Sequence, residues 1–105
     1  MVPLPDLSLQ PAVWKRMKNS YLEVTFRHGR PVAAYLYLPR QPTDKSSRTA
    51  RVELGLIIDF NRGGRPIGIE ITAPAKLSAA ALNRVLRRFG LPTVTPADLA
   101  PLRAA

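Results

Sequence analysis

The sequence predicts an α+β fold: a single small domain whose four-stranded antiparallel sheet carries one C-terminal helix on one face, followed by a short tail helix. Three observations lead to this prediction. Two alternating runs lie in residues 21–38, a β-hairpin pattern fills 51–72, and 78–89 show helical spacing of apolar residues. The expected parts are an N-terminal arm or short basic helix, the sheet, the helix and the tail, over residues 1–20, 21–75, 77–90 and 91–105.

The first twenty residues combine prolines with basic residues. Three prolines within residues 1–11 predict an extended arm, because proline fixes φ and removes a backbone donor. Residues 12–19 are expected to form one or two basic helical turns, with three side chains available for docking onto the core: Val13, Trp14 and Met17.

Two strands are expected at 21–27 and 32–38, joined by a turn at His28-Gly29-Arg30-Pro31. In the first strand, alternation directs Leu22, Val24 and Phe26 to one face of the sheet. The second strand leaves two alternatives open, because aliphatic and aromatic residues alternate along it. Either Leu36 and Leu38 are buried, or Tyr35 and Tyr37 are buried.

The pattern over residues 51–72 predicts a hairpin together with its register. A two-residue turn centred on Gly63-Gly64 suits glycine, which reaches positive φ without steric cost. This turn would pair Arg62 with Arg65, and would also form three apolar pairs: Phe60–Ile67, Ile58–Ile69 and Leu56–Ile71. A slip by one residue would mix Asp59 and Glu70 into the apolar face, so the turn and the pattern agree.

Two neighbouring features complete the expected sheet. Residues 39–49 are polar, contain two prolines and predict a surface loop. Pro66 would form a non-hydrogen-bonded pair with Asn61, which suits a position at the edge of the sheet.

The clearest helix is predicted at residues 78–89. Ser78 is the expected N-cap, and Leu77 and Leu82 occupy the positions of a hydrophobic staple. The core-facing stripe is Leu82, Val85, Leu86 and Phe89. Gly90 suits the left-handed position after the helix, and Thr95-Pro96 would open a short final turn over residues 97–102.

Composition limits the classes of function. The formal net charge is +9, from 16 Lys and Arg against 7 Asp and Glu, which favours an acidic partner such as nucleic acid. An arginine-rich composition with solvated side chains explains the charge equally well. The chain has no cysteine, which excludes disulfides and thiolate metal sites. The sequence has no signal-peptide pattern and no membrane-spanning apolar run, so we expect a cytoplasmic protein without a membrane partner.

The outer face of the sheet is the first candidate site. Its residues are Glu23, Tyr35, Tyr37, Asp59 and Glu70. In the derived register Asp59 faces Gly68, and glycine leaves room for a group to approach the backbone. Such a face would suit a hard metal ion or a general acid–base pair, or it is a solvated or dimer-facing surface with its carboxylates paired to arginine. We favour the last interpretation and expect no metal, no cofactor and no catalytic residue.

A second candidate is a basic surface for nucleic acid. Arg84, Arg87 and Arg88 fall within about a 100° arc of the helix. The N-terminal basic residues Lys15, Arg16 and Lys18 would extend this surface. The alternative is an ordinary exposed helix face. His28 and Gly63-Gly64 are interpreted as turn residues, because no catalytic partner surrounds the first and no helix follows the second.

The hairpin also resembles a known family. The segment Asp59 to Ile71, which reads Asp-Phe-Asn-Arg-Gly-Gly-Arg-Pro-Ile-Gly-Ile-Glu-Ile, is similar to the signature of the small prokaryotic family called domain of unknown function 2283. The earlier Leu36-Tyr37-Leu38 matches the family's first strand, so the resemblance covers roughly residues 21–75. Asn61 and Arg62 replace the family's acidic turn. The resemblance implies a small single domain, often encoded beside RelE-like toxins, and hence an antitoxin-like partner role.

The sequence therefore predicts a non-enzymatic protein-interaction module that self-associates, since the core is small and no catalytic set is present. The alternative is a basic nucleic-acid-binding protein that uses the Arg84, Arg87 and Arg88 helix face.

Overall fold

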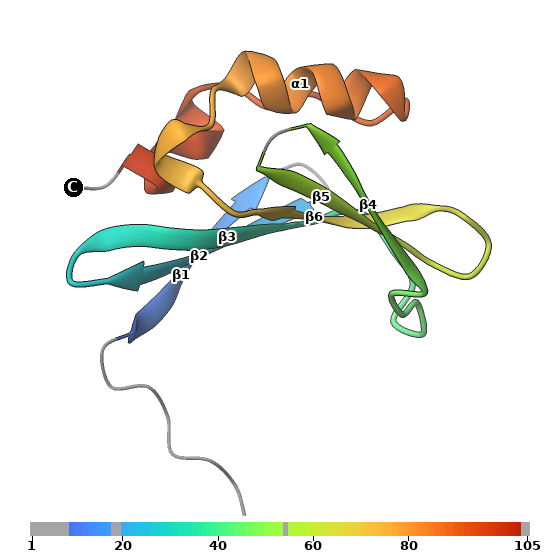
Figure 1. The fold of residues 1–105 in the computed structure, drawn as a ribbon, viewed down its shortest axis with the longest axis horizontal. Helices are drawn as coiled ribbons and strands as arrows, with labels where there is room; N and C mark the ends of the chain where they lie inside the picture. Colours follow the sequence, from blue (N-terminus) through green and yellow to red (C-terminus); the bar gives the residue numbers. More distant parts are fainter. Residues whose placement is uncertain (1–8, 18–19, 54, 104–105) are drawn as a thin grey trace, which may run out of the picture.

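The computed structural model describes residues 9–17, 20–53 and 55–103. These ranges form one antiparallel sheet with helical segments on one of its sides (Figure 1). The strands are β1 (Leu9–Met17), β2 (Ser20–Arg27), β3 (Arg30–Tyr37), β4 (Arg48–Glu53), β5 (Leu56–Phe60) and β6 (Pro66–Ile71). The helices are the 3-10 segment η1 (Pro74–Lys76), the α-helix α1 (Ala79–Arg88) and the 3-10 segment η2 (Ala97–Arg103).

The predicted α+β class is confirmed, but the described sheet has six strands instead of four. Their order is β1-β2-β3-β6-β5-β4. The long-range pairing of β3 with β6 joins two meanders into one sheet, and it sets Tyr35 opposite Glu70 and Tyr37 opposite Gly68. Leu38 extends this pairing, because its N–H donates to the carbonyl of Ile67.

The prediction of helical turns over residues 12–19 is wrong for the described part of that range. Residues up to Met17 belong to β1, which pairs antiparallel with β2. The register shifts between Gln10 and Val13, and Pro11 lies within this irregularity. Proline is tolerated there because β1 is an edge strand and a bulge needs no ladder donor. Residues 1–8 of the predicted arm lie outside the described residues.

The first half of the predicted hairpin is two strands. β4 and β5 pair with each other antiparallel, and β4 begins at Arg48, inside the predicted loop. Gly55 lies between them with a φ of 81°, a conformation that side chains with a Cβ rarely adopt. Its carbonyl accepts a hydrogen bond from the N–H of Thr72, which fixes the reversal against the end of β6.

The β5–β6 register is confirmed away from the turn. Leu56 pairs with Ile71 and Ile58 with Ile69, and Asp59 lies opposite Gly68 as predicted. The two-residue turn is wrong. The Asn61 N–H donates to the Arg65 carbonyl at 2.9 Å, so the loop spans residues 62–64, with Gly64 at a φ of 85°. A three-residue loop with glycine in the left-handed region is the next commonest hairpin connection.

A bulge reconciles this longer loop with the predicted register. Phe60 pairs with Pro66 instead of Ile67, and the Arg62–Arg65 and Asn61–Pro66 pairs do not form. The shift lies between Asp59 and Phe60, where one extra residue of β6 is inserted. β6 as a whole lies between β3 and β5, but the pairing with β3 ends before Pro66, so this residue has a paired neighbour on β5 alone. Proline is tolerated as the first residue of a strand.

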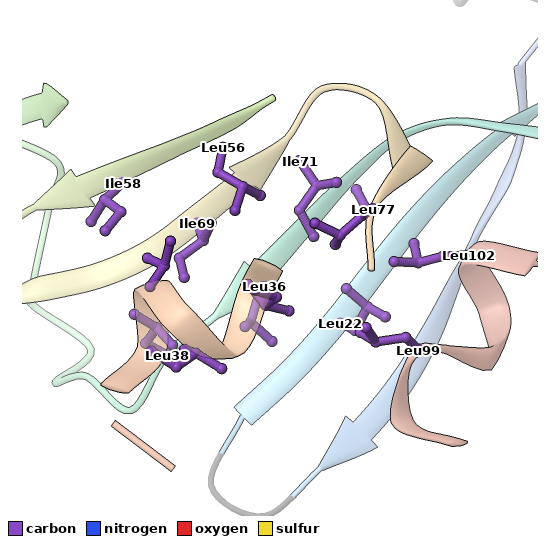
Figure 2. Close-up of a cluster of buried hydrophobic side chains, with 14 of the residues drawn as sticks. Leu22, Leu36, Leu38, Leu56, Ile58, Ile69, Ile71, Leu77, Leu99 and Leu102 are labelled. Atoms are coloured by element: carbon purple, nitrogen blue, oxygen red, sulfur yellow. The ribbon is translucent and has the colours of Figure 1, made fainter. Parts of the chain in front are cut away.

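The core lies between the sheet and the helical segments (Figure 2). Leu36 and Leu38 are buried, which decides the open question of β3 in favour of its leucines. The helix is confirmed: Ser78 Oγ accepts from the Ala81 N–H, and the three buried helix residues are Leu82, Val85 and Leu86. Phe89 packs edge-on against Phe60, at 5.8 Å between ring centroids.

The tail is held by polar contacts and by two buried leucines. The Asn83 side chain donates to the Val94 carbonyl at 2.9 Å and accepts from the Val94 N–H at 2.8 Å. Leu99 and Leu102 reach the core beside Leu22. The Arg103 guanidinium donates to the carbonyls of Pro74 and Leu77, so the predicted tail turn is a 3-10 helix fixed at both ends.

Candidate functional site on the outer face of the sheet

One face of the sheet packs against α1 and η2, and no described helix covers the other face (Figure 1). We call this second face the outer face. The strand alternation and the pairing place on it Tyr21, Glu23, Tyr35, Tyr37, Ile57, Asp59, Gly68 and Glu70. All five residues predicted for an outer-face site are therefore on one surface, contributed by β2, β3, β5 and β6.

Two tyrosine–carboxylate pairs organise the outer face. The Tyr35 hydroxyl donates to Asp59 Oδ2 at 2.6 Å, and the Tyr37 hydroxyl donates to Glu23 Oε1 at 3.3 Å. The two tyrosine rings contact each other, with centroids 4.6 Å apart and planes inclined by 56°. Four side chains from three strands are thus fixed in one hydrogen-bonded group.

Gly68 permits this arrangement. A Cβ built on Gly68 would lie 1.9 Å from the Tyr35 hydroxyl oxygen and 2.3 Å from Cζ of the same ring. The tyrosine ring therefore lies across the backbone of β6, over a position where another residue would place its side chain. The sequence predicts room for a ligand beside Gly68, but the Tyr35 ring fills this space.

The environment of both tyrosine hydroxyls raises their pKa values. Burial raises the pKa of Tyr35 well above its ordinary value, and the hydrogen bond to Asp59 raises it further. Burial also raises the pKa of Tyr37, with a smaller contribution from Glu23. Both hydroxyls hold their protons and act as structural donors. In the part of the chain that the structure describes, no group of three His, Asp or Glu side chains is arranged to hold a metal ion.

Two arginines stack on the tyrosines at one margin of the outer face. The Arg16 guanidinium lies 5.4 Å from the centroid of the Tyr21 ring, and Arg40 lies 5.3 Å from that of Tyr37. Between them is an open cavity of about 680 Å³. Its lining comprises Arg16, Tyr21, Tyr37, Leu38, Pro39, Arg40, Gln41 and Pro42.

A second open cavity of about 520 Å³ follows along the chain, between the loop after β3 and the β5–β6 turn. Its lining comprises Thr43, Asp44, Lys45, Ser46, Ser47, Asn61, Arg62 and Gly63. Asp44 holds the two segments together, because its carboxylate accepts from the Gln41 N–H at 2.9 Å and from Asn61 Nδ2 at 3.1 Å. These hydrogen bonds lower the pKa of Asp44.

The described side chains of the predicted basic surface do not all lie on one side of the sheet. Arg84 forms a two-point ion pair with Glu53, with Nε to Oε1 and Nη2 to Oε2 both at 3.1 Å, and this pairing lowers the pKa of Glu53. Arg87 and Arg88 are exposed on α1. Arg16 lies over Tyr21, on the opposite side of the sheet from α1. The backbone of Lys15 belongs to β1, and Lys18 lies outside the described residues.

Sequence reasoning missed Tyr21 and Arg40 as members of a site. Strand alternation puts Tyr21 on the face opposite Leu22, but only the β2–β3 register brings it beside Tyr37. Arg40 lies in a segment that reads as an ordinary polar loop. Its flanking Pro39 and Pro42 were the available signal, since proline restricts the backbone on both sides. His28 lies in the predicted turn with a φ of 51°.

Comparison with known proteins agrees with the resemblance seen in the hairpin. The family model described as "Protein of unknown function (DUF2283)" matches residues 33–73, which span β4, β5, β6 and the second half of β3. No curated protein and no solved structure matches the chain. Among the described residues no helix has the length and apolar character needed to cross a membrane. The resemblance of residues 33–73 to the DUF2283 family, whose function is unknown, is thereby confirmed.

Proposed function

We propose that this protein is a non-enzymatic interaction module that self-associates through its outer face. The observation that carries the proposal is the fixed tyrosine–carboxylate group on a sheet face that no described helix covers. Tyrosine is enriched at protein interfaces because it combines apolar area with a polar tip. Side chains already held in one geometry lose little conformational freedom on binding, which favours association.

Sheet extension through the edge strands is a less suitable route. The two edge strands of the described sheet, β1 and β4, have features that oppose the addition of another strand. β1 has Pro11 and an irregular register, and β4 has a register shift between Arg51 and Glu53. Association by stacking of the outer faces avoids both edges.

The charge distribution on the outer face supports a second copy of the chain as the partner. Arginines lie on the two edge strands, at Arg16 and Arg51, while the carboxylates lie on inner strands, at Glu23, Asp59 and Glu70. When two sheets stack with their strands offset or crossed, the edge of one copy lies over the inner strands of the other. Such a surface is self-complementary, as a two-fold interface requires.

Sedimentation velocity over a wide concentration range tests this proposal. The wild-type protein is expected to shift from monomer to dimer as concentration rises, and added salt is expected to weaken the dimer. Ile57 lies half-buried on the outer face, so Ile57→Lys should leave a monomer. Ala80→Lys is the matched control, because it adds the same charge at an exposed position of α1.

Two results would contradict self-association through this face. The first is a wild-type protein that stays monomeric up to millimolar concentration. The second is an equal effect of Ile57→Lys and Ala80→Lys on the dimer, which would show that net charge and not the outer face controls association.

An antitoxin-like role is a more specific version of the proposed interaction module, with a toxin protein as the partner of the outer face. Its support is the resemblance to the DUF2283 family over residues 33–73. These residues contribute Tyr35, Tyr37, Asp59 and Glu70 to the outer face. A toxin partner would therefore compete with self-association, and Ile57→Lys would weaken both.

Nucleic-acid binding by the predicted helix face receives less support. The Nε and Nη2 atoms of Arg84 already form a two-point pair with Glu53, so the carboxylate offsets the charge that a phosphate would need. Arg87 and Arg88 are exposed on α1, so their substitution is a suitable control in nucleic-acid binding experiments.

A further inference from the structure

We propose that the end of the sheet where β3 terminates is a binding site for single-stranded nucleic acid, with phosphates on Arg16, Arg40, Lys45 and Arg62 and bases stacked on the arginine–tyrosine pairs. The strand register brings these residues together. Arg16 pairs with Tyr21, Tyr21 with Tyr37, and Tyr37 with Gly68 near the start of β6. The ends of β1, β3 and β5 and the beginnings of β2, β4 and β6 thus lie at one end of the molecule.

The two open cavities at this end are lined by one continuous segment, residues 37–47, together with β1, β2 and the β5–β6 turn. The lining includes four exposed cations, two in each cavity. Asp44 is the one acidic residue in either lining, and its carboxylate oxygens are occupied by Gln41 and Asn61. Four cations against this one carboxylate leave the combined lining with a net positive charge, which attracts an anion.

The stacked arginines favour nucleic acid over a simple anion. Each guanidinium lies over a tyrosine ring, and both arginine–tyrosine pairs line the same cavity. Unpaired bases stack on aromatic rings and on guanidinium planes, and stacking does not depend on base identity. Tyr21 is 42% exposed, so its ring is also accessible from the side. A duplex would offer the phosphates but not the flat faces of its bases.

The salt dependence of binding gives a quantitative expectation. If each of the four cations neutralises one phosphate, the slope of log K against log salt is about −2.8 for a single strand. Removing Arg16 and Arg40 together is expected to reduce the slope to about −1.4. Tyr21→Ala removes stacking and no charge, so it is expected to weaken binding about tenfold with the slope unchanged.

Fluorescence anisotropy of short labelled oligonucleotides, with the full chain, tests the site. The probes are single-stranded DNA, single-stranded RNA and a duplex of equal length. The variants are Arg16→Ala with Arg40→Ala, and Tyr21→Ala, each checked for an unchanged melting temperature because all three side chains lie at the surface. Arg87→Ala with Arg88→Ala removes the same charge from α1 and is the matched control.

Binding of either single strand, lost in the Arg16 and Arg40 variant and kept in the Arg87 and Arg88 variant, supports the proposal. The relative affinities for single-stranded DNA and single-stranded RNA show which of the two nucleic acids the site prefers. The proposal is overturned if neither single strand binds at low salt, if the duplex binds as tightly, or if the control variant loses as much affinity. Equal competition by a polyglutamate peptide would overturn it too, since it would assign the site to acidic proteins.

Discussion

At the scale of single residues, the organising contact is between Gly68 and Tyr35. Glycine in the middle of a strand ordinarily weakens it, because glycine has no side chain to pack. Here the missing Cβ makes room for the Tyr35 ring, which crosses β6 and reaches Asp59 on β5. One tyrosine therefore links three adjacent strands through its ring and its hydroxyl.

Gly68→Ala tests this contact. We expect a loss of about 1–3 kcal/mol in the free energy of unfolding, because the new Cβ displaces the ring and breaks the bond to Asp59. Denaturant unfolding measures it. Gly63→Ala is the control, since its Cβ would meet only Asn61 Oδ1 at 3.5 Å, and a change within about 0.5 kcal/mol is expected. Adding Tyr35→Ala to Gly68→Ala should give less than the sum of the two losses.

The contact between Gly68 and Tyr35 could not be predicted from the sequence, although the burial of single residues in β2 could. Alternation placed Leu22, Val24 and Phe26 inside correctly, because burial of one face is a local periodic signal. It did not separate the leucines of β3 from its tyrosines, since both kinds of side chain are largely apolar. The choice depends on β6, whose glycine accepts a tyrosine ring on one face only.

At the scale of elements, local signals predicted α1 well and β1 poorly. The helix has its cap, staple and stripe within a dozen consecutive residues, so neighbours along the chain determine it. The β1 segment has Val13, Trp14 and Met17 at a spacing that suits a helix as well as a strand. Its state depends on pairing with β2, and a proline lies inside it.

The junction between α1 and the tail supplies a test at this scale. Asn83→Ala removes two hydrogen bonds to Val94, and we expect a loss of about 1–3 kcal/mol because one backbone donor and one acceptor lose their partners. Amide hydrogen exchange at Val94 should accelerate more than exchange within α1. Arg87→Ala, one helical turn further on and exposed, should change neither quantity. Equal protection of Val94 in both variants would contradict the assigned role.

At the scale of the whole molecule, the fold depends on residues beyond the family match. Residues 33–73 include Leu36, Ile58 and Ile69, whose buried faces are covered by α1 from later in the chain. The tail adds Leu99 and Leu102 over β2. The sheet order could not be derived from the sequence, because the β3–β6 pairing joins segments about thirty residues apart and no local signal specifies it.

A fragment experiment examines this dependence. The isolated segment 33–73 is expected to lack a cooperative thermal transition by circular dichroism, because it exposes one whole apolar face of its sheet. The segment 9–103 keeps α1 and the tail, and it should melt cooperatively. A sharp transition in the shorter fragment would show that the matched region is a complete folding unit by itself.

The bulge in β6 has a consequence for how this hairpin tolerates change. The loop over residues 62–64 and the strand beyond it are out of step by one residue, and the inserted residue of β6 absorbs the difference before Gly68 is reached. Pairing of the buried isoleucines is therefore the same as a two-residue loop without a bulge would give. A change of one residue at the tip can thus be offset by a bulge while the tyrosine–carboxylate group stays in place. The position of the exposed Arg62 at the tip can therefore change without disturbing the core of the hairpin.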